Sequence, residues 1–218
     1  DVLGMNRRNV ELVIPRNPRA HFSIANNKLL AKRHLSAAGV QVAETLTTFE
    51  SFSEVSDVEG RLAGFTEFVI KPAHGSGGRG IMVIKGREGA DFITVSDRRV
   101  TPAMMKRHIA DLVYGVYSLD RADVAIVEPL LKAHPWFKGL FEGGLSDVRV
   151  IVIDDQAALA MIRVPTRASD GRANLHQGGI GLGVDLQTGR VTRALWRGRP
   201  LTLHPDSKAP LVGEFVPH

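Results

Sequence analysis

The chain has 218 residues, enough for one large domain or two small lobes, and its 44% hydrophobic and 23% charged residues are typical of a globular protein. It contains no cysteine, which excludes disulfides and thiolate metal sites and fits a cytoplasmic location. No apolar run approaches the ~20 residues needed to span a bilayer, so no membrane span is expected.

The net charge is positive, because 28 Lys and Arg stand against 23 Asp and Glu, giving 28 − 23 = +5. Such a balance can indicate a nucleic-acid-binding protein. However, the arginines are spread along the chain, aromatic residues make up only 6%, and no zinc-finger, RNP-type or basic-zipper pattern is present. We therefore expect no nucleic-acid partner, since arginines facing an anionic small molecule explain the charge equally well.

The first third of the chain predicts an arm followed by helices. Residues 1–25 are rich in Arg, Asn and Pro and are expected to be irregular. Asn26 is a candidate N-cap for a helix that Gly39 ends, and residues 45–49 suggest a short strand. Ser51-x-x-Glu54 matches a capping box and predicts a helix to about residue 62.

The remainder predicts strands with one long helix. Residues 68–70 and 81–84 are expected to be strands on either side of a glycine-rich loop, with a third strand at 92–95. Thr101 and Pro102 begin a helix to about Tyr114. Further strands are expected at 124–127, 148–153, 158–164, 178–185 and 191–196. The pattern predicts an α+β fold with an arm (1–25), an opening helix and small lobe (26–121) and a β-rich lobe (122–218).

The most informative segment runs from Phe68 to Ile84, FVIKPAHGSGGRGIMVI. Four glycines within six residues let the backbone approach a ligand closely and point its N–H groups at an anion. Lys71 places a fixed cation beside this loop. Together these features predict a phosphate site, most economically for a nucleotide triphosphate.

Three known nucleotide-binding motifs have a similar arrangement of glycines and lysine. Gly75-x-Gly77-x-x-Gly80 matches the dinucleotide fingerprint, but that motif requires a helix after the loop, and the apolar run after Gly80 predicts a strand. A Walker A loop would end in Gly-Lys-Ser/Thr, which is absent. In protein kinases the lysine follows the loop, whereas Lys71 precedes it. An ordinary flexible hairpin loop remains the alternative.

Other segments carry a family resemblance along nearly the whole chain: residues 3–9 (LGMNRRN), 27–32 (NKLLAK), 147–150 (DVRV) and 165–179 (PTRASDGRANLHQGG). With the Lys71 loop, they resemble the ATP-grasp superfamily and within it the RimK-like glutamate ligases. The likeness is closest to the alpha-L-glutamate-ligase-like proteins, also described as sugar-transfer-associated ATP-grasp proteins.

The resemblance implies an ATP-grasp fold, in which two α+β lobes grip ATP. It also implies an ADP-forming carboxylate–amine ligase that uses ATP and Mg²⁺. A carboxylate substrate attacks the γ-phosphate to give an acyl phosphate, and an amine acceptor such as an amino acid then forms an amide. A non-catalytic or regulatory ATP-binding homologue is the alternative. The substrates and the oligomeric state stay open.

The resemblance also assigns roles to residues. Lys28 and Lys71 would bind phosphates, and the loop would close over them through His74, Gly75, Ser76, Gly77, Gly78, Arg79 and Gly80. The adenine would lie at Glu128 and Leu130, where two lobes meet. Substrate or γ-phosphate contacts would come from Arg149, Arg163, Arg167 and Asn174. Taken singly, several of these residues are also ordinary surface residues; Asp147 and Arg149, for example, share one face of a strand.

One part of the family pattern is missing. ATP-grasp proteins bind magnesium through an acidic residue on one late strand and a Glu-x-Asn on the next, and no Glu-x-Asn follows the loop here. We therefore expect no metal ligands in this chain. The chain is either cut short or degenerate, and we expect the former, because the missing strands would follow His218. As it stands, it is not expected to complete a catalytic cycle.

Overall fold

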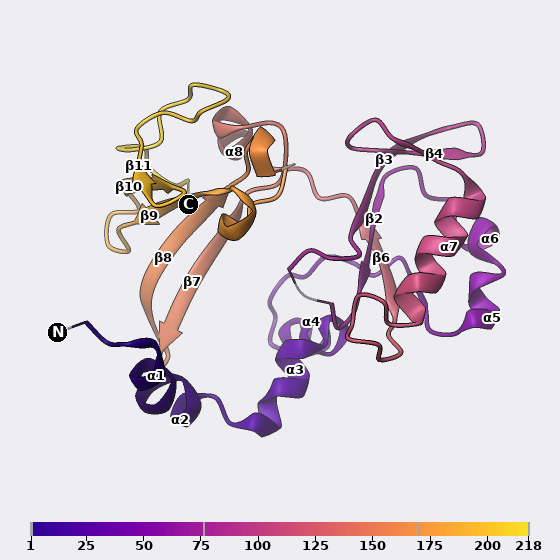
Figure 1. Ribbon diagram of the computed structural model, residues 1–218, viewed down its shortest axis with the longest axis horizontal. Coiled ribbons are helices and arrows are strands. Elements are labelled where there is room, and N and C mark those ends of the chain that lie inside the picture. Colours follow the sequence, from indigo (N-terminus) through magenta and orange to yellow (C-terminus); the bar gives the residue numbers. More distant parts are fainter. Residues whose placement is uncertain (1, 76, 170, 218) are drawn as a thin grey trace. The chain divides into compact units, whose positions relative to one another are not determined.

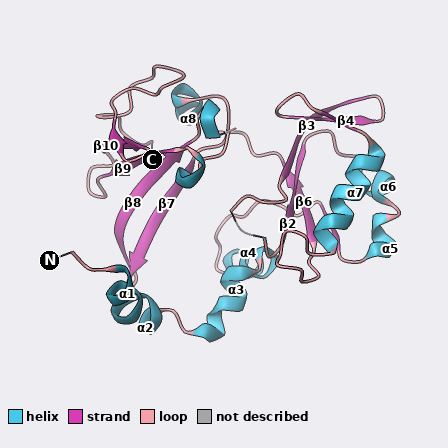
Figure 2. Cartoon of the chain, in the orientation of Figure 1, coloured by secondary structure: helices cyan, strands magenta, loops and turns pink. Residues whose placement is uncertain are grey.

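The computed structural model describes residues 2–75, 77–169 and 171–217. The chain divides into two compact units, residues 1–131 and 132–218, each built on its own antiparallel sheet (Figures 1 and 2). This confirms the predicted α+β class. The sequence placed the boundary at 121/122, but the strand at 125–129 pairs within the first sheet, so the first unit extends to Leu131.

The arm is not irregular, which corrects the prediction for residues 1–25. It consists of short helical segments: α1 (Met5–Arg7), a π-helix (Arg8–Val13), α2 (Ile14–Arg16), a 3₁₀ turn (Arg19–His21) and α3 (Phe22–Asn26). Local bonds stabilise these turns. Arg7 Nε donates to Glu11 Oε1 at 2.8 Å, one helical turn on, and Asn17 Nδ2 donates to the Val13 carbonyl at 2.7 Å.

Helix α4 (Lys28–Ala37) follows, and its ends are set by local chemistry. The N-cap is Asn27 rather than the predicted Asn26, because the Asn27 side chain accepts from the Leu30 N–H at 3.0 Å. Gly39 ends the helix as expected, with a φ of +76°. None of the ten described residues of α4 is fully buried. Its position on the unit therefore depends on partly buried and polar contacts.

The first sheet has the strand order β1-β6-β2-β3-β4-β5. Its strands are β1 (Thr47–Phe49), β2 (Phe68–Pro72), β3 (Met82–Glu88), β4 (Asp91–Thr94), β5 (Arg99–Val100) and β6 (Ala125–Pro129). The glycine-rich loop joins β2 to β3, so a strand does follow it, as predicted. The two-residue strand β5 was not expected, because it is too short to show an alternating pattern.

Three helices cover one face of this sheet: α5 (Phe52–Val55), α6 (Val58–Leu62) and α7 (Pro102–Val113) (Figure 1). Thr101 caps α7 as predicted, accepting from the Met104 N–H at 3.2 Å. The capping box is not completed, because the Ser51 side chain makes no cap hydrogen bond and lies 2.9 Å from Ser53 Oγ instead. The predicted single helix is two short ones. The core between sheet and helices includes Phe68, Ile70, Ile84, Phe92, Ile109, Leu112 and Val127.

The second unit contains α8 (Pro135–Leu140) and a sheet in the order β11-β10-β9-β8-β7. Its strands are β7 (Asp147–Ile153), β8 (Gln156–Val164), β9 (Ile180–Val184), β10 (Val191–Trp196) and β11 (Arg199–Pro200). Both predicted hairpins are present, whereas α8 and β11 were not expected. The core gathers Leu140, Phe141, Ile162, Val164, Ile180, Leu182, Val191 and Leu211. Among the described residues, no helix is both long and apolar enough to cross a bilayer.

The first core predicts a stability effect that can be assigned to one unit. Phe68 is fully buried and meets Phe92 edge-on, with ring centroids 5.7 Å apart. Phe68→Ala should lower the free energy of unfolding of the first unit by about 3–5 kcal/mol through lost burial and a cavity. Urea unfolding followed by circular dichroism would measure this. Both tryptophans, Trp136 and Trp196, lie in the second unit, so their fluorescence reports on that unit separately.

The matched control is Phe22→Ala, which removes a ring that is 45% exposed and should change stability by about 0.5 kcal/mol or less. Equal losses in the two variants would contradict the assignment of Phe68 to the core.

Candidate functional site

The candidate site begins on the face of the first sheet that lies opposite α5, α6 and α7. Alternation along β2 turns Phe68 and Ile70 into the helix-covered core and Lys71 to the other face. On β6, Val127 enters that core, so the side chain of Glu128 lies on the same face as Lys71. Lys71 pairs in register with Ile126, which puts Lys71 and Glu128 diagonally across neighbouring strands.

Glu128 lies between two ammonium groups. Its Oε2 is 2.5 Å from Lys71 Nζ, and its Oε1 is 2.8 Å from Lys32 Nζ of α4. The Glu128 side chain is only 6% exposed, and those of Lys32 and Lys71 are 16% and 23% exposed. Lys32 also donates to Thr45 Oγ1 at 2.7 Å. A buried carboxylate thus joins α4 to β2, and its removal would leave two partly buried ammonium groups without their counter-charge.

Lys28 lies one helical turn before Lys32 and turns toward the start of the glycine-rich loop. Its Nζ donates to the carbonyls of Gly75 at 2.6 Å and Ala73 at 3.3 Å, and its backbone N–H donates to Ala73 O at 3.0 Å. Burial lowers the pKa of the Lys28 ammonium, and the nearby positive charge of Lys71 lowers it further. We call Lys28, Lys32 and Lys71 the lysine cluster.

The glycine-rich loop has a backbone that depends on glycine. Gly77, Gly78 and Gly80 have φ of +65°, +77° and +74°, a region that other residues rarely adopt. A Cβ on Gly80 would also lie 2.7 Å from the Tyr117 ring. Gly77 and Gly78 differ, because a Cβ there would meet no described atom within 4 Å. The crest of the loop is therefore open, while its end is packed against the unit.

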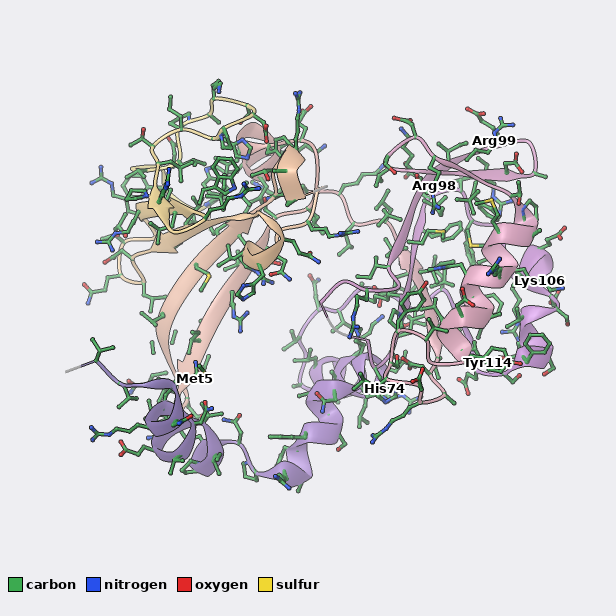
Figure 3. All side chains as sticks on the ribbon, in the orientation of Figure 1. Met5, His74, Arg98, Arg99, Lys106 and Tyr114 are labelled. Carbon is green, nitrogen blue, oxygen red and sulfur yellow. The ribbon has the colours of Figure 1, made fainter. Side chains whose placement is uncertain are left out.

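His74 lies at the start of this loop (Figure 3). It anchors the loop to Asp123, just before β6. Its Nδ1 lies 2.7 Å from Asp123 Oδ1, and its backbone N–H donates to Asp123 Oδ2 at 3.0 Å. Ser118 also donates to this carboxylate, as does the Val124 N–H at 2.7 Å. Burial alone would raise the pKa of Asp123, but these hydrogen bonds hold it below its ordinary value. Asp123 is therefore ionised at neutral pH.

The structure brings together most of the site residues predicted in the first unit. Lys71 forms an ion pair with Glu128, and Lys28 lies close enough to both to interact with their charges. Lys28 also contacts the loop. Arg79 is exposed on the loop, Leu130 is half-buried just after β6, and Ser76 lies outside the described residues. Both Glu128 carboxylate oxygens bind lysines in this structure, so its contact with adenine stays a prediction.

The sequence reading missed Lys32 and Asp123. The signal for Lys32 was its spacing: it is four residues from Lys28 and so lies on the same face of α4. Asp123 gave no comparable signal, because only the fold brings it to His74, 49 residues earlier in the chain.

The residues predicted to contact substrate lie in the second unit. Arg163 makes a two-pronged bond to Asp147, at 2.7 and 2.8 Å, across paired positions of β7 and β8. The hydrogen bonds to Asp147 raise the pKa of Arg163. Arg149 and Arg167 are exposed. Asn174 caps a 3₁₀ turn (Leu175–Gln177), where its side chain accepts from the His176 N–H at 3.2 Å. Their roles toward substrate stay predictions.

The donor set also bears on a metal ion. In the part of the chain that the structure describes, no three His, Asp or Glu side chains converge as a metal site would require. The acidic groups of the candidate site, Glu128 and Asp123, are occupied by lysines and by hydrogen-bond donors. The described residues thus do not fit a magnesium site.

A comparison with known protein families gives one match. A family model described as sugar-transfer associated ATP-grasp matches residues 7–218. The chain belongs to this ATP-grasp family.

Other comparisons are less informative. No curated protein matches the chain. Among solved structures, the crystal structure of D-cycloserine synthetase DcsG matches with a TM-score of 0.35 and 16% identity, covering 89% of this ATP-grasp chain and 66% of that one. The chain therefore spans just under two thirds of the length of that structure.

The buried carboxylate predicts a large stability effect. Glu128→Gln keeps the shape of the side chain but leaves Lys32 and Lys71 without their counter-charge. We expect the free energy of unfolding of the first unit to fall by about 3 kcal/mol, measured by urea unfolding with circular dichroism. Added inorganic phosphate should restore part of this loss, since an anion can replace the missing charge.

Glu88→Gln is the matched control, because Glu88 binds Arg99 in a pair whose side chains are 63% and 59% exposed. An exposed pair of this kind contributes little, so the control should unfold like the unmodified chain. If Glu128→Gln behaved in the same way, the carboxylate would not hold the cluster together.

Proposed function

We propose that the chain forms the nucleotide-binding part of an ATP-dependent carboxylate–amine ligase. The observation that carries this proposal is the lysine cluster beside an open glycine-rich loop. Three ammonium groups face two carboxylates, Glu128 and Asp123, which leaves 3 − 2 = +1 at a partly buried place. Burial and the charge of Lys71 both disfavour the charged form of Lys28 and lower its pKa. A bound anion would stabilise that charged form, so the lowered pKa supports an anion-binding role.

The chemistry of ATP suits these residues. Lys28 and Lys71 would bind the phosphate groups, and Lys28 has a third N–H beyond the two that serve Ala73 and Gly75. The open crest at Gly77 and Gly78 would bring backbone N–H groups close to phosphate oxygens. The chain after Glu128, including Leu130, would line the adenine.

The proposed reaction joins a carboxylate to an amine. The carboxylate oxygen bonds to the γ-phosphorus of ATP, ADP leaves, and the amine then displaces phosphate from the acyl phosphate to give an amide. In this scheme Arg149, Arg163, Arg167 and Asn174 would orient the carboxylate substrate. Positioning and charge neutralisation are the main contributions of protein groups to such transfers. An alpha-L-glutamate-type, RimK-like ligase of the cytoplasm is the specific form that we propose, and the Mg²⁺ that such a ligase uses would need ligands other than the described residues.

A second candidate is an ATP-binding homologue without ligase activity. It is favoured by one observation: the described residues do not supply an acidic metal site. Release of ADP that depends on both a carboxylate and an amino acid would support the ligase, whereas binding without such release would support the homologue.

Calorimetric titration of ATP tests the nucleotide site. Lys71→Ala should weaken ATP binding by about 10- to 100-fold, the loss of a hydrogen bond to a charged group. Lys85→Ala is the matched control, because Lys85 lies on neighbouring β3 and binds only the exposed Asp97. AMP should bind far more weakly than ATP, since the lysine cluster would bind the β- and γ-phosphates, which AMP lacks. Failure of ATP to bind the unmodified chain, or equal affinity for AMP and ATP, would contradict the proposed site.

The lowered pKa of Lys28 predicts proton uptake on ATP binding. In the free protein part of the Lys28 population loses its proton at alkaline pH below the usual lysine range, and a bound polyanion raises that pKa again. Binding should therefore take up protons between the free and bound pKa values and none through this group at neutral pH. Calorimetry in two buffers of different ionisation enthalpy measures the uptake. Unchanged uptake in Lys28→Met would contradict the assignment to Lys28.

A further inference from the structure

A chain of hydrogen bonds links the N-terminus of α4 to the start of β6 through the glycine-rich loop. Asn27 Nδ2 lies 3.2 Å from His74 Nε2, and His74 Nδ1 lies 2.7 Å from Asp123 Oδ1. The Asp123 side chain is completely buried, whereas that of His74 is 45% exposed. The three residues are distant in sequence, and the proposed ligase chemistry assigns no role to the contacts among them.

Asp123 at one end of this series of hydrogen bonds and Asn27 at the other each fix the direction of their bond to His74. Asp123 is ionised and can only accept, so His74 Nδ1 carries a proton and donates it. The Asn27 carbonyl oxygen accepts from the Leu30 N–H, which turns the amide nitrogen of Asn27 toward His74. His74 Nε2 therefore accepts. The two ends require the same neutral tautomer.

This chain of bonds holds the residues around Lys28 in place. Asn27 caps α4 and directly precedes Lys28. His74 stands between Ala73 and Gly75, whose carbonyls accept from the Lys28 ammonium. Since none of the described α4 residues is fully buried, little apolar packing fixes this helix end. Loss of the Asn27–His74 bond would let the cap and Lys28 move away from the loop.

We propose that His74 is a positioning residue, which in its Nδ1-protonated form ties the cap of α4 to Asp123 and so holds Lys28 against the glycine-rich loop. A second proton, on Nε2, would place a donor against the Asn27 amide and break the link. Phosphate binding at the loop should therefore weaken on acidification. The proposal rests on the proposed nucleotide site for its ligand, but the tautomer can be tested without one.

The other charged and titratable groups around the loop do not supply this switch. The groups facing it are Asp123 before β6, Lys28 on α4, Lys71 on β2, Arg79 on the loop and His108 on α7. Hydrogen bonds hold the pKa of Asp123 below its ordinary value, so this carboxylate stays ionised through the range in which an ordinary histidine titrates, about pH 5 to 8. Burial lowers the pKa of His108, which bonds to the Gly80 carbonyl at the packed end of the loop.

The first experiment reads the tautomer in the whole ligand-free chain. Nitrogen-15 NMR of the histidine side chains, with His74→Asn to identify the His74 signals, should show a protonated Nδ1 and an unprotonated Nε2 at about pH 8. An Nε2-protonated form, or an equal mixture of tautomers, would overturn the proposal whatever the chain binds.

The second experiment measures ATP affinity against pH in matched variants. His74→Asn can keep a hydrogen-bond donor toward Asp123 but has no acceptor for the Asn27 amide in the place of Nε2. Because this variant lacks the imidazole, its pH profile also shows how the ionisation of ATP itself affects binding. The unmodified chain should bind about fivefold more tightly than His74→Asn near pH 8, the size of one ordinary hydrogen bond, and the two should converge near pH 5. Parallel pH profiles would overturn the proposal.

Asn27→Asp provides the sharpest variant, because it keeps a good N-cap but replaces the amide donor with an acceptor. The link to His74 would then form only with the doubly protonated imidazole, so affinity relative to His74→Asn should rise on acidification, opposite to the unmodified chain. An Asn27→Asp profile that follows the unmodified chain would overturn the proposal. If ATP bound to none of these proteins, the nucleotide site would fail, and the NMR result would still decide the hydrogen-bond chain.

Discussion

The contact on which the candidate site depends is the buried carboxylate of Glu128 between Lys32 and Lys71, at 2.8 and 2.5 Å. It joins α4 to the neighbouring strands β2 and β6. Because α4 has no fully buried residue among those described, apolar packing fixes it less firmly than it fixes α7, which buries Met105, Ile109 and Leu112. A helix held by partly buried charges is positioned accurately only while each charge keeps its partner.

This arrangement trades stability for readiness to bind. Burial first, and then the positive charge of Lys71, lower the pKa of Lys28, and this shift records the cost of placing ammonium groups in one partly buried region. A protein selected only for stability would replace one lysine with an apolar residue of similar volume. Retaining all three keeps cationic groups fixed and partly desolvated before an anion arrives, so little reorganisation is needed on binding. Charges placed at a cost to stability are expected at a functional site.

The sequence predicted best those features that depend on neighbouring residues. Gly39 and the Thr101-Pro102 start of α7 are local signals, and both are confirmed. Features that depend on tertiary contacts were predicted poorly. Strand β6 was assigned to the second lobe because its place beside β2 cannot be seen in a short apolar run. Ser51 and Glu54 were expected to form a capping box, but the Ser51 side chain makes no cap hydrogen bond, and Glu54 also accepts from Glu50 and binds Arg61. For the same reason Lys71 and Glu128 were both singled out, but the ion pair between them and the part that Lys32 takes in it were not expected.

The two units differ in how their cations are satisfied, and this difference narrows the candidate roles. Burial and repulsion lower the pKa of Lys28, whereas Arg163 has a raised pKa because Asp147 binds it through two hydrogen bonds. A cation with a complete partner has less to gain from a new anion, so Arg163 is better explained as a brace between β7 and β8. Within the proposed function, the exposed Arg149 and Arg167 are then the stronger candidates for a substrate carboxylate, a ranking that the sequence alone left open.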